Sequence, residues 1–359
     1  MNENPMTTNF ERMMTEAARL MRSGSLVEAT AAIQQALGAT PPAAPVGVPP
    51  GHRSEDDVID VEARVIAEPH AAPGTAARAQ AESFTAGHFK SDCGARDYKL
   101  FEPARDGRTL PLVVMLHGCT QDPDDFARGT HMNALAREQG CLVLYPAQSQ
   151  RANAQRCWNW FKHNHQARGK GEPAILAAMV RDVIATHDVD PARVYVAGLS
   201  AGGAMAAILG DAYPELFAAV GVHSGLPTGS ATDVQTAFAA MSGGAQPVRR
   251  GAKHAATPPT IVFHGDADTT VNVVNGERVL KAAGLFARPE ARRGATAMGV
   301  PYSCRVYVDA QGHERAEEWT IHGAGHAWSG GDLAGSYTDP RGPDASAEML
   351  RFFLQHPRR

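Results

Sequence analysis

The most informative segment of the 359-residue chain is Arg193-Val-Tyr-Val-Ala-Gly-Leu-Ser-Ala-Gly-Gly-Ala-Met-Ala-Ala-Ile208. Its β-branched apolar residues favour a strand, and the small residues after Gly202 favour a helix. A serine at such a turn is held in a strained conformation that lifts its hydroxyl clear of the sheet, while nearby glycines let strand and helix approach. The pattern predicts a nucleophile elbow with Ser200 as the nucleophile. A glycine-rich turn that only packs a helix is the alternative.

A serine nucleophile on an elbow predicts an acid and a histidine downstream. A serine hydroxyl is weakly nucleophilic at neutral pH and needs a histidine base that a carboxylate orients. In elbow folds the acid precedes the histidine, and both lie on loops after later strands. The apolar run Thr260–Phe263 is followed by His264-Gly-Asp-Ala-Asp268. We predict Asp268 as the acid because it lies further along the loop, and we interpret Asp266 as a turn former.

The base is predicted to be His326. It lies among glycines in Gly323-Ala-Gly-His-Ala-Trp-Ser-Gly-Gly331, directly after the strand-like segment Glu317–His322. A loop after a late strand is where an elbow fold places its histidine. His322, at a strand end, and His264, beside the acid, hold positions more typical of structural residues.

Two backbone amides are candidates for an oxyanion hole. Ala201 follows the serine at a helix N-terminus, where backbone N–H groups lack helical partners. The second donor is expected from the loop after an early strand, Leu116-His-Gly-Cys-Thr-Gln121, which we call the oxyanion loop. Within it, the N–H of Cys119 is the candidate donor and Gln121 a candidate substrate contact. A Cys119 thiolate nucleophile is the rival interpretation, although no elbow surrounds it.

Three tryptophans are candidates for substrate binding. Trp158 and Trp160 lie in Arg156-Cys-Trp-Asn-Trp-Phe161, which we call the aromatic segment. Aromatic faces offer a large contact area with few rotamers to restrict, so this segment could wall an acyl or polyester pocket. A plug in the core is the alternative. Trp328, two residues after His326, is predicted to line the active site.

Apolar strand-like segments alternate with helix-like segments through most of the chain. This alternation predicts right-handed crossovers and an α/β fold with an open, doubly wound, mostly parallel sheet. The predicted strands are Ser83–Lys90, Arg96–Glu102, Leu110–His117, Cys141–Tyr145, the elbow strand, Ala218–His223, Thr260–His264, Tyr302–Val308 and Glu317–His322. The predicted helices are Pro173–His187, a helix within Thr232–Met241, and Ala345–Gln355.

Three regions are expected along the chain. Residues 1–38 contain two helix-like runs that predict a short helical hairpin, which could dock on the main domain or on a partner. Residues 39–81 are rich in proline, alanine and glycine and are expected to form a flexible linker, although 57–66 could add an edge strand. Residues 82–359 are expected to form the catalytic domain.

Composition and charge exclude several classes of protein. Hydrophobic residues make up 43% of the chain, enough for a sizeable core. With 38 acidic and 34 basic residues, the net charge of −4 does not suggest a nucleic-acid-binding surface. No apolar run has the length of a membrane span, and the N-terminus lacks a secretory pattern. These features favour a cytoplasmic protein, with secretion as the alternative.

Cysteines and histidines give no sign of a metal or cofactor. The five cysteines include no Cys-x-x-Cys pair, and their odd number leaves at least one unpaired. Cys141 and Cys304 lie in apolar runs and are predicted to be buried thiols. His163-Asn-His165 lacks a third ligand nearby, and no glycine-rich loop has phosphate-binding spacing. We therefore expect no cofactor.

Six segments in this order resemble the poly(3-hydroxybutyrate) depolymerase family of serine esterases. They are Leu116–Gln121, Cys157–Phe161, Gly169–Pro173, Gly198–Gly203, His264–Asp268 and Gly325–Gly331. The resemblance extends from about Phe84 to the C-terminus. It implies an α/β-hydrolase fold and hydrolysis of carboxylic esters, with Ser200, Asp268 and His326 on the triad positions and Cys119 on the oxyanion loop.

Two features are expected to depart from that family. Lys162-His-Asn-His165 is basic where acidic residues are expected, and we expect no module for adsorption on insoluble polymer after the His326 loop. The expected substrates are hydroxyalkanoate oligomers, soluble or amorphous polyester, and short-chain esters. A feruloyl or acetylxylan-type carbohydrate esterase is the first alternative. A non-catalytic binding scaffold, whose N-terminal hairpin docks on a granule or a partner, is the alternative from another class.

Overall fold

The computed structural model describes residues 81–105, 107–244, 257–283 and 289–358. The helical hairpin expected in 1–38 and the linker expected in 39–81 lie outside these residues, apart from Ala81. The described residues belong to one compact unit, and its first strand begins at Ser83. No helix within these ranges is both long and apolar enough to span a bilayer.

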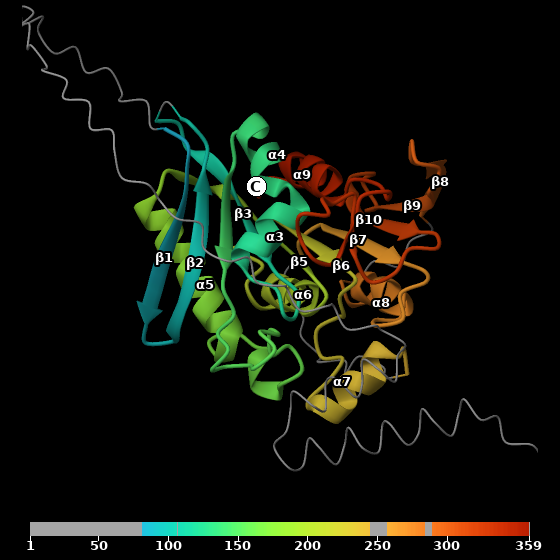
Figure 1. Ribbon diagram of the computed structural model, residues 1–359, viewed down its shortest axis with the longest axis horizontal. Helices are drawn as coiled ribbons and strands as arrows, with labels where there is room; N and C mark the ends of the chain where they lie inside the picture. The colour runs from blue at the N-terminus through green and yellow to red at the C-terminus, as the bar shows by residue number, and fades with distance from the viewer. Residues whose placement is uncertain (1–80, 106, 245–256, 284–288, 359) are drawn as a thin grey trace, which may run out of the picture. The chain divides into compact units, whose positions relative to one another are not determined.

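A ten-stranded sheet runs through this unit in the order β1-β2-β4-β3-β5-β6-β7-β10-β9-β8 (Figure 1). Neighbouring strands from β4 to β10 in this order are parallel, whereas β1 and β2 at one side and β9 and β8 at the other are antiparallel additions. The strands are β1 Ser83–Ser91, β2 Gly94–Glu102, β3 Leu110–Leu116, β4 Leu142–Pro146, β5 Val189–Leu199, β6 Ala219–His223, β7 Thr260–Gly265, β8 Glu290–Ala295, β9 Pro301–Val308 and β10 Glu314–Ile321. This arrangement confirms the predicted doubly wound, mostly parallel sheet.

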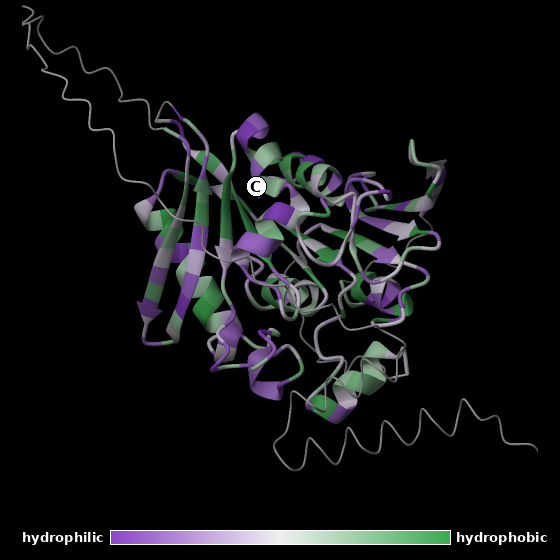
Figure 2. Cartoon of the chain, in the orientation of Figure 1, coloured by the Kyte–Doolittle hydropathy of each residue, from purple (hydrophilic) through white to green (hydrophobic). Residues whose placement is uncertain are grey.

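Helices cover both faces of the sheet because successive strand residues point to opposite sides. In β3, Leu112 and Val114 join the core that includes α5 and α6, and Val113 and Met115 join the core that includes α4 and α9. The central strands are accordingly apolar along their length (Figure 2). The helices are α3 Pro123–Thr130, α4 Met132–Gln139, the 3-10 helix η1 His163–His165, α5 Gly171–Thr186, α6 Ala201–Ala212, α7 Val234–Met241, α8 Val274–Ala282 and α9 Ala345–Gln355.

The structure differs from the sequence prediction mainly where apolar periodicity is weak. Strand β8 was not predicted, because its residues are charged or small and mostly exposed, and it joins the sheet through backbone pairing with β9. The short helices α3, α4 and α8 were also missed. Strand β5 begins at Val189 instead of Arg193, and its pairing with β3 contains a register shift.

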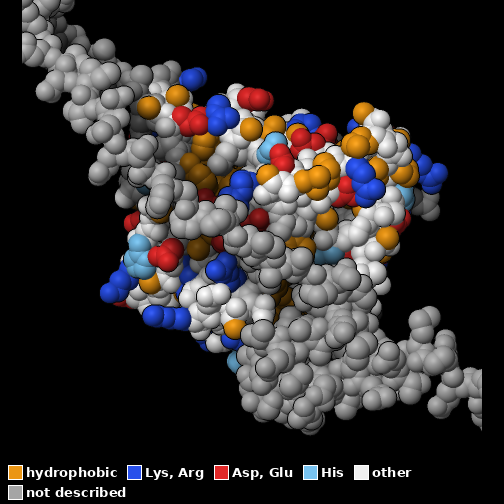
Figure 3. All heavy atoms as spheres, in the orientation of Figure 1, with side chains coloured by type: hydrophobic (Ala, Val, Ile, Leu, Met, Phe, Trp, Pro, Cys, Tyr) orange, Lys and Arg blue, Asp and Glu red, His pale blue; other side chains and the backbone are white. Residues whose placement is uncertain are grey.

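Charged side chains of both signs are mixed on the face drawn in Figure 3. This mixing agrees with the nearly balanced 38 acidic and 34 basic residues of the chain. Such a surface offers no single-sign field over the described part of that face that would attract a polyanion.

Candidate active site

Ser200 occupies a sharp turn between β5 and α6. Its backbone has φ 57° and ψ −117°, a conformation that a non-glycine residue holds only where the surrounding structure enforces it. Its N–H donates to the carbonyl oxygen of His223 on β6 at 2.8 Å. The residue is partly exposed, so the strained turn presents a reachable hydroxyl at the carboxyl edge of the parallel strands.

Gly198 and Gly202 allow α6 to lie directly against the strands. A Cβ on Gly202 would lie 2.0 Å from the carbonyl oxygen of Leu116 and 2.6 Å from that of His117. A Cβ on Gly198 would lie 2.4 Å from the carbonyl carbon of Gly202. The N-terminus of α6, which carries the Ala201 amide, therefore lies against the start of the oxyanion loop.

Asp268 and His326 lie on loops that follow the neighbouring parallel strands β7 and β10. Nδ1 of His326 is 2.7 Å from Oδ2 of Asp268, whose Oδ1 accepts the N–H groups of Thr270 and Val271, each at 2.8 Å. The side chain of Asp268 is fully buried and that of His326 is 12% exposed. With Nδ1–H directed at the carboxylate, Nε2 is left as the basic nitrogen.

The surroundings of Asp268 keep its carboxyl group ionised. Burial acts to raise the pKa, but hydrogen bonds from His264, His326 and the Val271 amide outweigh it and hold the pKa well below its usual range. Nε2 of His264 lies 3.5 Å from Oδ2 of Asp268 and 2.8 Å from the carbonyl oxygen of Val271. His264 thus supports the acid loop, in agreement with the structural position expected from the sequence.

Asp266, the alternative acid, faces a different histidine. Its Oδ2 lies 2.8 Å from Nδ1 of His322, and its Oδ1 accepts the N–H of Gly323 at 2.7 Å. The structure therefore brings Asp268, and not Asp266, to His326.

Ser200 Oγ and His326 share no hydrogen bond within the described residues. Such bonds often form only when substrate is bound. His223 connects the two segments, because its carbonyl accepts the Ser200 N–H and its Nε2 accepts the N–H of Ser329 at 3.0 Å. Burial lowers the pKa of His223 to about 3, so the ring stays neutral and can accept. The sequence did not predict that His223 connects these two segments, since a histidine at the end of an apolar strand matches no catalytic motif.

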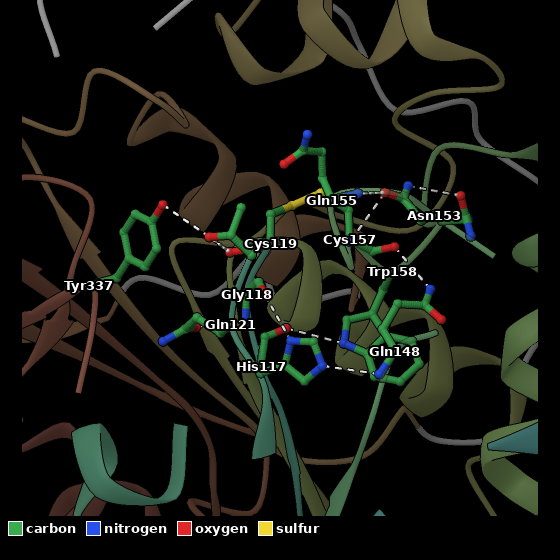
Figure 4. The surroundings of a disulfide bond; sticks show 12 residues. His117, Gly118, Cys119, Gln121, Gln148, Asn153, Gln155, Cys157, Trp158 and Tyr337 are labelled. Carbon is green, nitrogen blue, oxygen red and sulfur yellow. Dashed lines mark hydrogen bonds between the residues drawn. A yellow bond between two sulfur atoms is a disulfide. The ribbon is translucent and has the colours of Figure 1, made fainter. Parts of the chain in front are cut away.

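The oxyanion loop is held by a disulfide between Cys119 and Cys157 (Figure 4). The sequence left the cysteine pairing open. The adjacent Thr120 has φ 67° and donates its N–H to the carbonyl oxygen of Gln155 at 2.6 Å. A Cys119 thiolate nucleophile does not fit this arrangement, because the sulfur is already bonded. Cys141 and Cys304 are buried free thiols, as predicted.

Gln121 supports the oxyanion loop from within. Its side chain is buried, and Oε1 accepts the N–H of Gly118 at 2.9 Å. Its Nε2 donates to Oδ2 of Asp125 and to the carbonyl oxygen of Ser336, each at 3.0 Å. Since both ends of the amide already have partners, Gln121 fits a structural role better than the predicted substrate contact.

The aromatic segment lies in the core beneath this loop. Trp158 and Trp160 are 0% and 6% exposed, which does not fit the predicted pocket wall and agrees with the core-plug alternative. The indole N–H of Trp158 donates to the carbonyl oxygen of His117 at 3.1 Å (Figure 4). Trp158 thus fixes the His117 carbonyl near the start of the oxyanion loop.

Trp328 is also buried, contrary to the prediction that it lines the active site. Only 1% of it is exposed, and its ring stacks on His223 with the centroids 5.1 Å apart. Its indole N–H donates to Oγ of Ser346 at 3.0 Å. The ring supports the histidine loop from the core side.

Glu172, at the start of α5, anchors the aromatic segment. Its carboxylate accepts the Asn159 N–H and side-chain amide, each at 2.7 Å, and the Gln148 amide at 2.5 Å. Arg96 lies 3.3 Å and His165 Nδ1 3.5 Å from its oxygens. Burial acts to raise the pKa of Glu172, but these hydrogen bonds outweigh it and lower the pKa. The acid of the Gly169–Pro173 motif is therefore a structural anchor.

Comparison with known proteins gives a consistent result. The family described as Esterase PHB depolymerase matches residues 97–298, a range that contains Ser200 and Asp268. The chain is 34% identical over 230 residues to poly(3-hydroxyalkanoate) depolymerase C of Paucimonas lemoignei, covering 60% of this chain and 54% of that protein. It is 28% identical over 246 residues to the poly(3-hydroxybutyrate) depolymerase of Ralstonia pickettii, covering 64% and 50%. The chain thus spans about half the length of these curated relatives.

Similarity extends to esterases with other names. Feruloyl esterase B of Thermothelomyces thermophilus is 29% identical over 198 residues, covering 51% of this chain and 67% of that protein. Among solved structures, an acetyl xylan esterase from Aspergillus awamori matches with a TM-score of 0.55 and 21% identity over 67% of this chain and 94% of that one. This likeness supports the α/β-hydrolase fold. Since the family match covers more than half of the 359 residues, the chain belongs to the PHB depolymerase family of esterases.

Proposed function

We propose that this protein is a serine esterase that hydrolyses carboxylic esters through an acyl-enzyme. The observation that carries the proposal is the hydrogen bond of 2.7 Å between Asp268 and His326, on the sheet edge where Ser200 follows β5 in a strained turn. Parallel strands place their carboxyl ends at one edge, so loops after β5, β7 and β10 supply all three groups.

In the proposed reaction, Ser200 Oγ attacks the ester carbonyl carbon while Nε2 of His326 takes the hydroxyl proton. The carbonyl oxygen becomes an oxyanion that the amides of Cys119 and Ala201 stabilise. His326 then protonates the leaving alcohol. Water, deprotonated by the same nitrogen, attacks the acyl-enzyme and releases the acid. Asp268, ionised and buried, orients the ring and stabilises the imidazolium.

The favoured substrates are 3-hydroxybutyrate oligomers, related polyester and short-chain esters. The depolymerase names of two relatives support this class. A carbohydrate esterase is the second candidate, supported by similarity to feruloyl esterase B and to acetylxylan esterase A of Talaromyces purpureogenus, which is 29% identical over 246 residues.

The disulfide of the oxyanion loop supports an oxidising compartment. Structural disulfides persist outside the reducing cytosol. We therefore favour the extracellular alternative over the cytoplasmic location expected from the sequence.

The test compares a 3-hydroxybutyrate trimer, methyl ferulate and an acetylated xylo-oligosaccharide as substrates. Ser200→Ala should lower kcat at least about a thousandfold on any substrate that the wild type cleaves. Ser91→Ala, at the end of β1, is the control and should retain activity. Activity that survives Ser200→Ala would refute the mechanism, and the order of wild-type kcat/KM values selects between the two substrate classes.

A further inference from the structure

Asp266 and His322 form a second carboxylate–imidazole pair between the loops that carry Asp268 and His326. The outer pair has Nδ1 of His322 at 2.8 Å from Oδ2 of Asp266, and the inner pair has the equivalent atoms at 2.7 Å. The outer side chains are 40% and 38% exposed, whereas the inner ones are nearly or fully buried. The same two loops are therefore joined twice.

The outer pair continues to Ser303 on β9. Oγ of Ser303 lies 2.8 Å from Nε2 of His322. Strand β9 pairs with β10, and β10 ends directly before His322. When the ring is neutral and donates through Nδ1 to Asp266, Nε2 can accept the serine O–H. When the ring is charged, both nitrogens donate and the serine oxygen accepts. The chain of hydrogen bonds can thus persist in either protonation state.

Two glycines of the loop that carries His326 have open space where a side chain would lie. Gly323, with φ 75°, and Gly325 flank Ala324, and a Cβ at either glycine would have no atom within 4 Å. Glycines in such open surroundings leave the backbone free unless hydrogen bonds restrict it.

The acid loop supplies these restraints through the backbone of Asp266 and Ala267 and through the side chain of Asp266. Its N–H donates to the carbonyl oxygen of Ile321 at 3.1 Å, and the N–H of Ala267 donates to that of Ala324 at 3.1 Å. Its Oδ1 accepts the Gly323 N–H at 2.7 Å. The carboxylate therefore holds the histidine loop at the His322 ring and at the following amide.

We propose that Asp266 and His322, backed by Ser303, are positioning residues that hold the His326 loop against the acid loop. This outer clamp keeps His326 oriented for proton transfer without touching substrate. The inference rests on the proposed function of Ser200, Asp268 and His326.

The outer clamp differs from an ordinary surface ion pair. An isolated exposed pair contributes little, because solvent screens it and two side chains lose freedom. Here one carboxylate binds both a ring and a backbone amide of the same loop. Burial acts to raise the pKa of Asp266, but the hydrogen bonds from His322 and Gly323 outweigh it and lower the pKa. The folded loop thus favours the ionised carboxylate.

The experiment uses the full chain and two substitutions of His322. His322→Ala removes the donor, whereas His322→Asn keeps a side-chain N–H near the position of Nδ1. With a soluble p-nitrophenyl ester, His322→Ala should lower kcat about 10- to 100-fold and change KM little, because the base is misplaced after substrate has bound. His322→Asn should recover most of the lost kcat.

A matched control exists at the other end of the same hairpin. Asp309 and His313 form an exposed pair at 3.3 Å on the turn between β9 and β10. His313→Ala should leave kcat and KM unchanged. If His313→Ala lowered kcat as much as His322→Ala, the proposal would be overturned. The loss of kcat would then come from a disturbance of the whole β9–β10 hairpin and not from the outer clamp.

Hydrogen–deuterium exchange of residues 322–327 gives a readout that does not depend on catalysis. The exchange should be faster in His322→Ala than in the wild type and in His313→Ala. Wild-type values of either kcat or exchange in His322→Ala would overturn the clamp, as would equal losses in His322→Asn and His322→Ala. If the wild type cleaves no ester, the proposed function fails, and the exchange data alone decide whether the clamp orders the loop.

Discussion

Cys119 and Cys157 are joined by a disulfide across a sequence separation of 38. The bond links the proposed oxyanion donor to the aromatic segment, which Glu172 anchors to α5 through Asn159. The position of the Cys119 amide therefore depends on a covalent bond and a buried carboxylate as well as on the loop itself.

Removal of this disulfide should lower both stability and activity. The double variant Cys119→Ser/Cys157→Ser should lose about 2–4 kcal/mol of unfolding free energy, because its unfolded chain is less restricted. Its kcat should also fall, since the oxyanion amide is held less firmly. Urea unfolding and ester hydrolysis measure the two effects, and Cys93→Ser, at an exposed free thiol, is the control. Wild-type kcat in the double variant would mean that the loop keeps its geometry without the bond.

The two aspartates of the acid loop should differ in their effect on catalysis. Asp268→Asn should lower kcat about ten-thousandfold, because His326 loses the partner that fixes its tautomer. Asp266→Asn should lower kcat far less than Asp268→Asn, since it weakens only the outer clamp. Steady-state kinetics on a soluble ester compare them, and the reverse order of losses would identify Asp266 as the acid.

Two buried histidines should make the protein sensitive to mild acid. Burial lowers the pKa of His117 to about 4 and that of His223 to about 3, from 6.5 in the unfolded chain. Below about pH 6.5 these two histidines bind more protons in the unfolded chain than in the folded one, so their contribution to the unfolding free energy falls with pH until these values are reached. The expected slope is up to about 1.4 kcal/mol per pH unit for each histidine. Urea midpoints measured from neutral to acidic pH give this slope, reduced by the opposite contribution of Glu314, whose pKa burial raises to about 7. An unfolding free energy that rises with falling pH below pH 6.5 would show that the folded rings already carry protons.

A methyl group at Gly202 should disrupt the elbow. Its Cβ would lie 2.0 Å from the carbonyl oxygen of Leu116, and neither backbone can yield easily. Gly202→Ala should therefore cost at least about 2 kcal/mol of stability. Gly325→Ala is the control for thermal unfolding, because a Cβ there meets nothing within 4 Å. Equal melting temperatures for the two variants would contradict the close approach.

Sequence alone predicted the parallel centre of the fold because buried strands are continuous apolar runs. The segments of β3, β6 and β7 read in this way, and the switch to small residues after Ser200 identified the elbow. The same reasoning missed β8. This edge strand is mostly exposed, so its sequence does not show the alternation of apolar and polar residues that a buried face produces.

Parts of the candidate site depend on contacts between distant segments, which residue order cannot reveal. The order of serine, acid and histidine along the chain predicted which two loops carry the acid and the base. In the structure these loops bring Asp268 and His326 together. The partners of Gln121 include Ser336, which lies 215 positions later, so its structural role was invisible in the sequence. Trp328 was expected near substrate because it lies only two residues after His326 in the sequence. In the structure its ring points into the core and stacks on His223.

The outermost strands of the described sheet, β1 and β8, carry charged or titratable side chains at exposed positions. These include Glu290, Arg292 and Arg293 on β8 and His88 and Lys90 on β1. A free sheet edge can recruit a strand from another molecule, and charged residues there oppose such addition. Both ends of the described sheet are thus suited to resist the addition of a strand from another folded molecule.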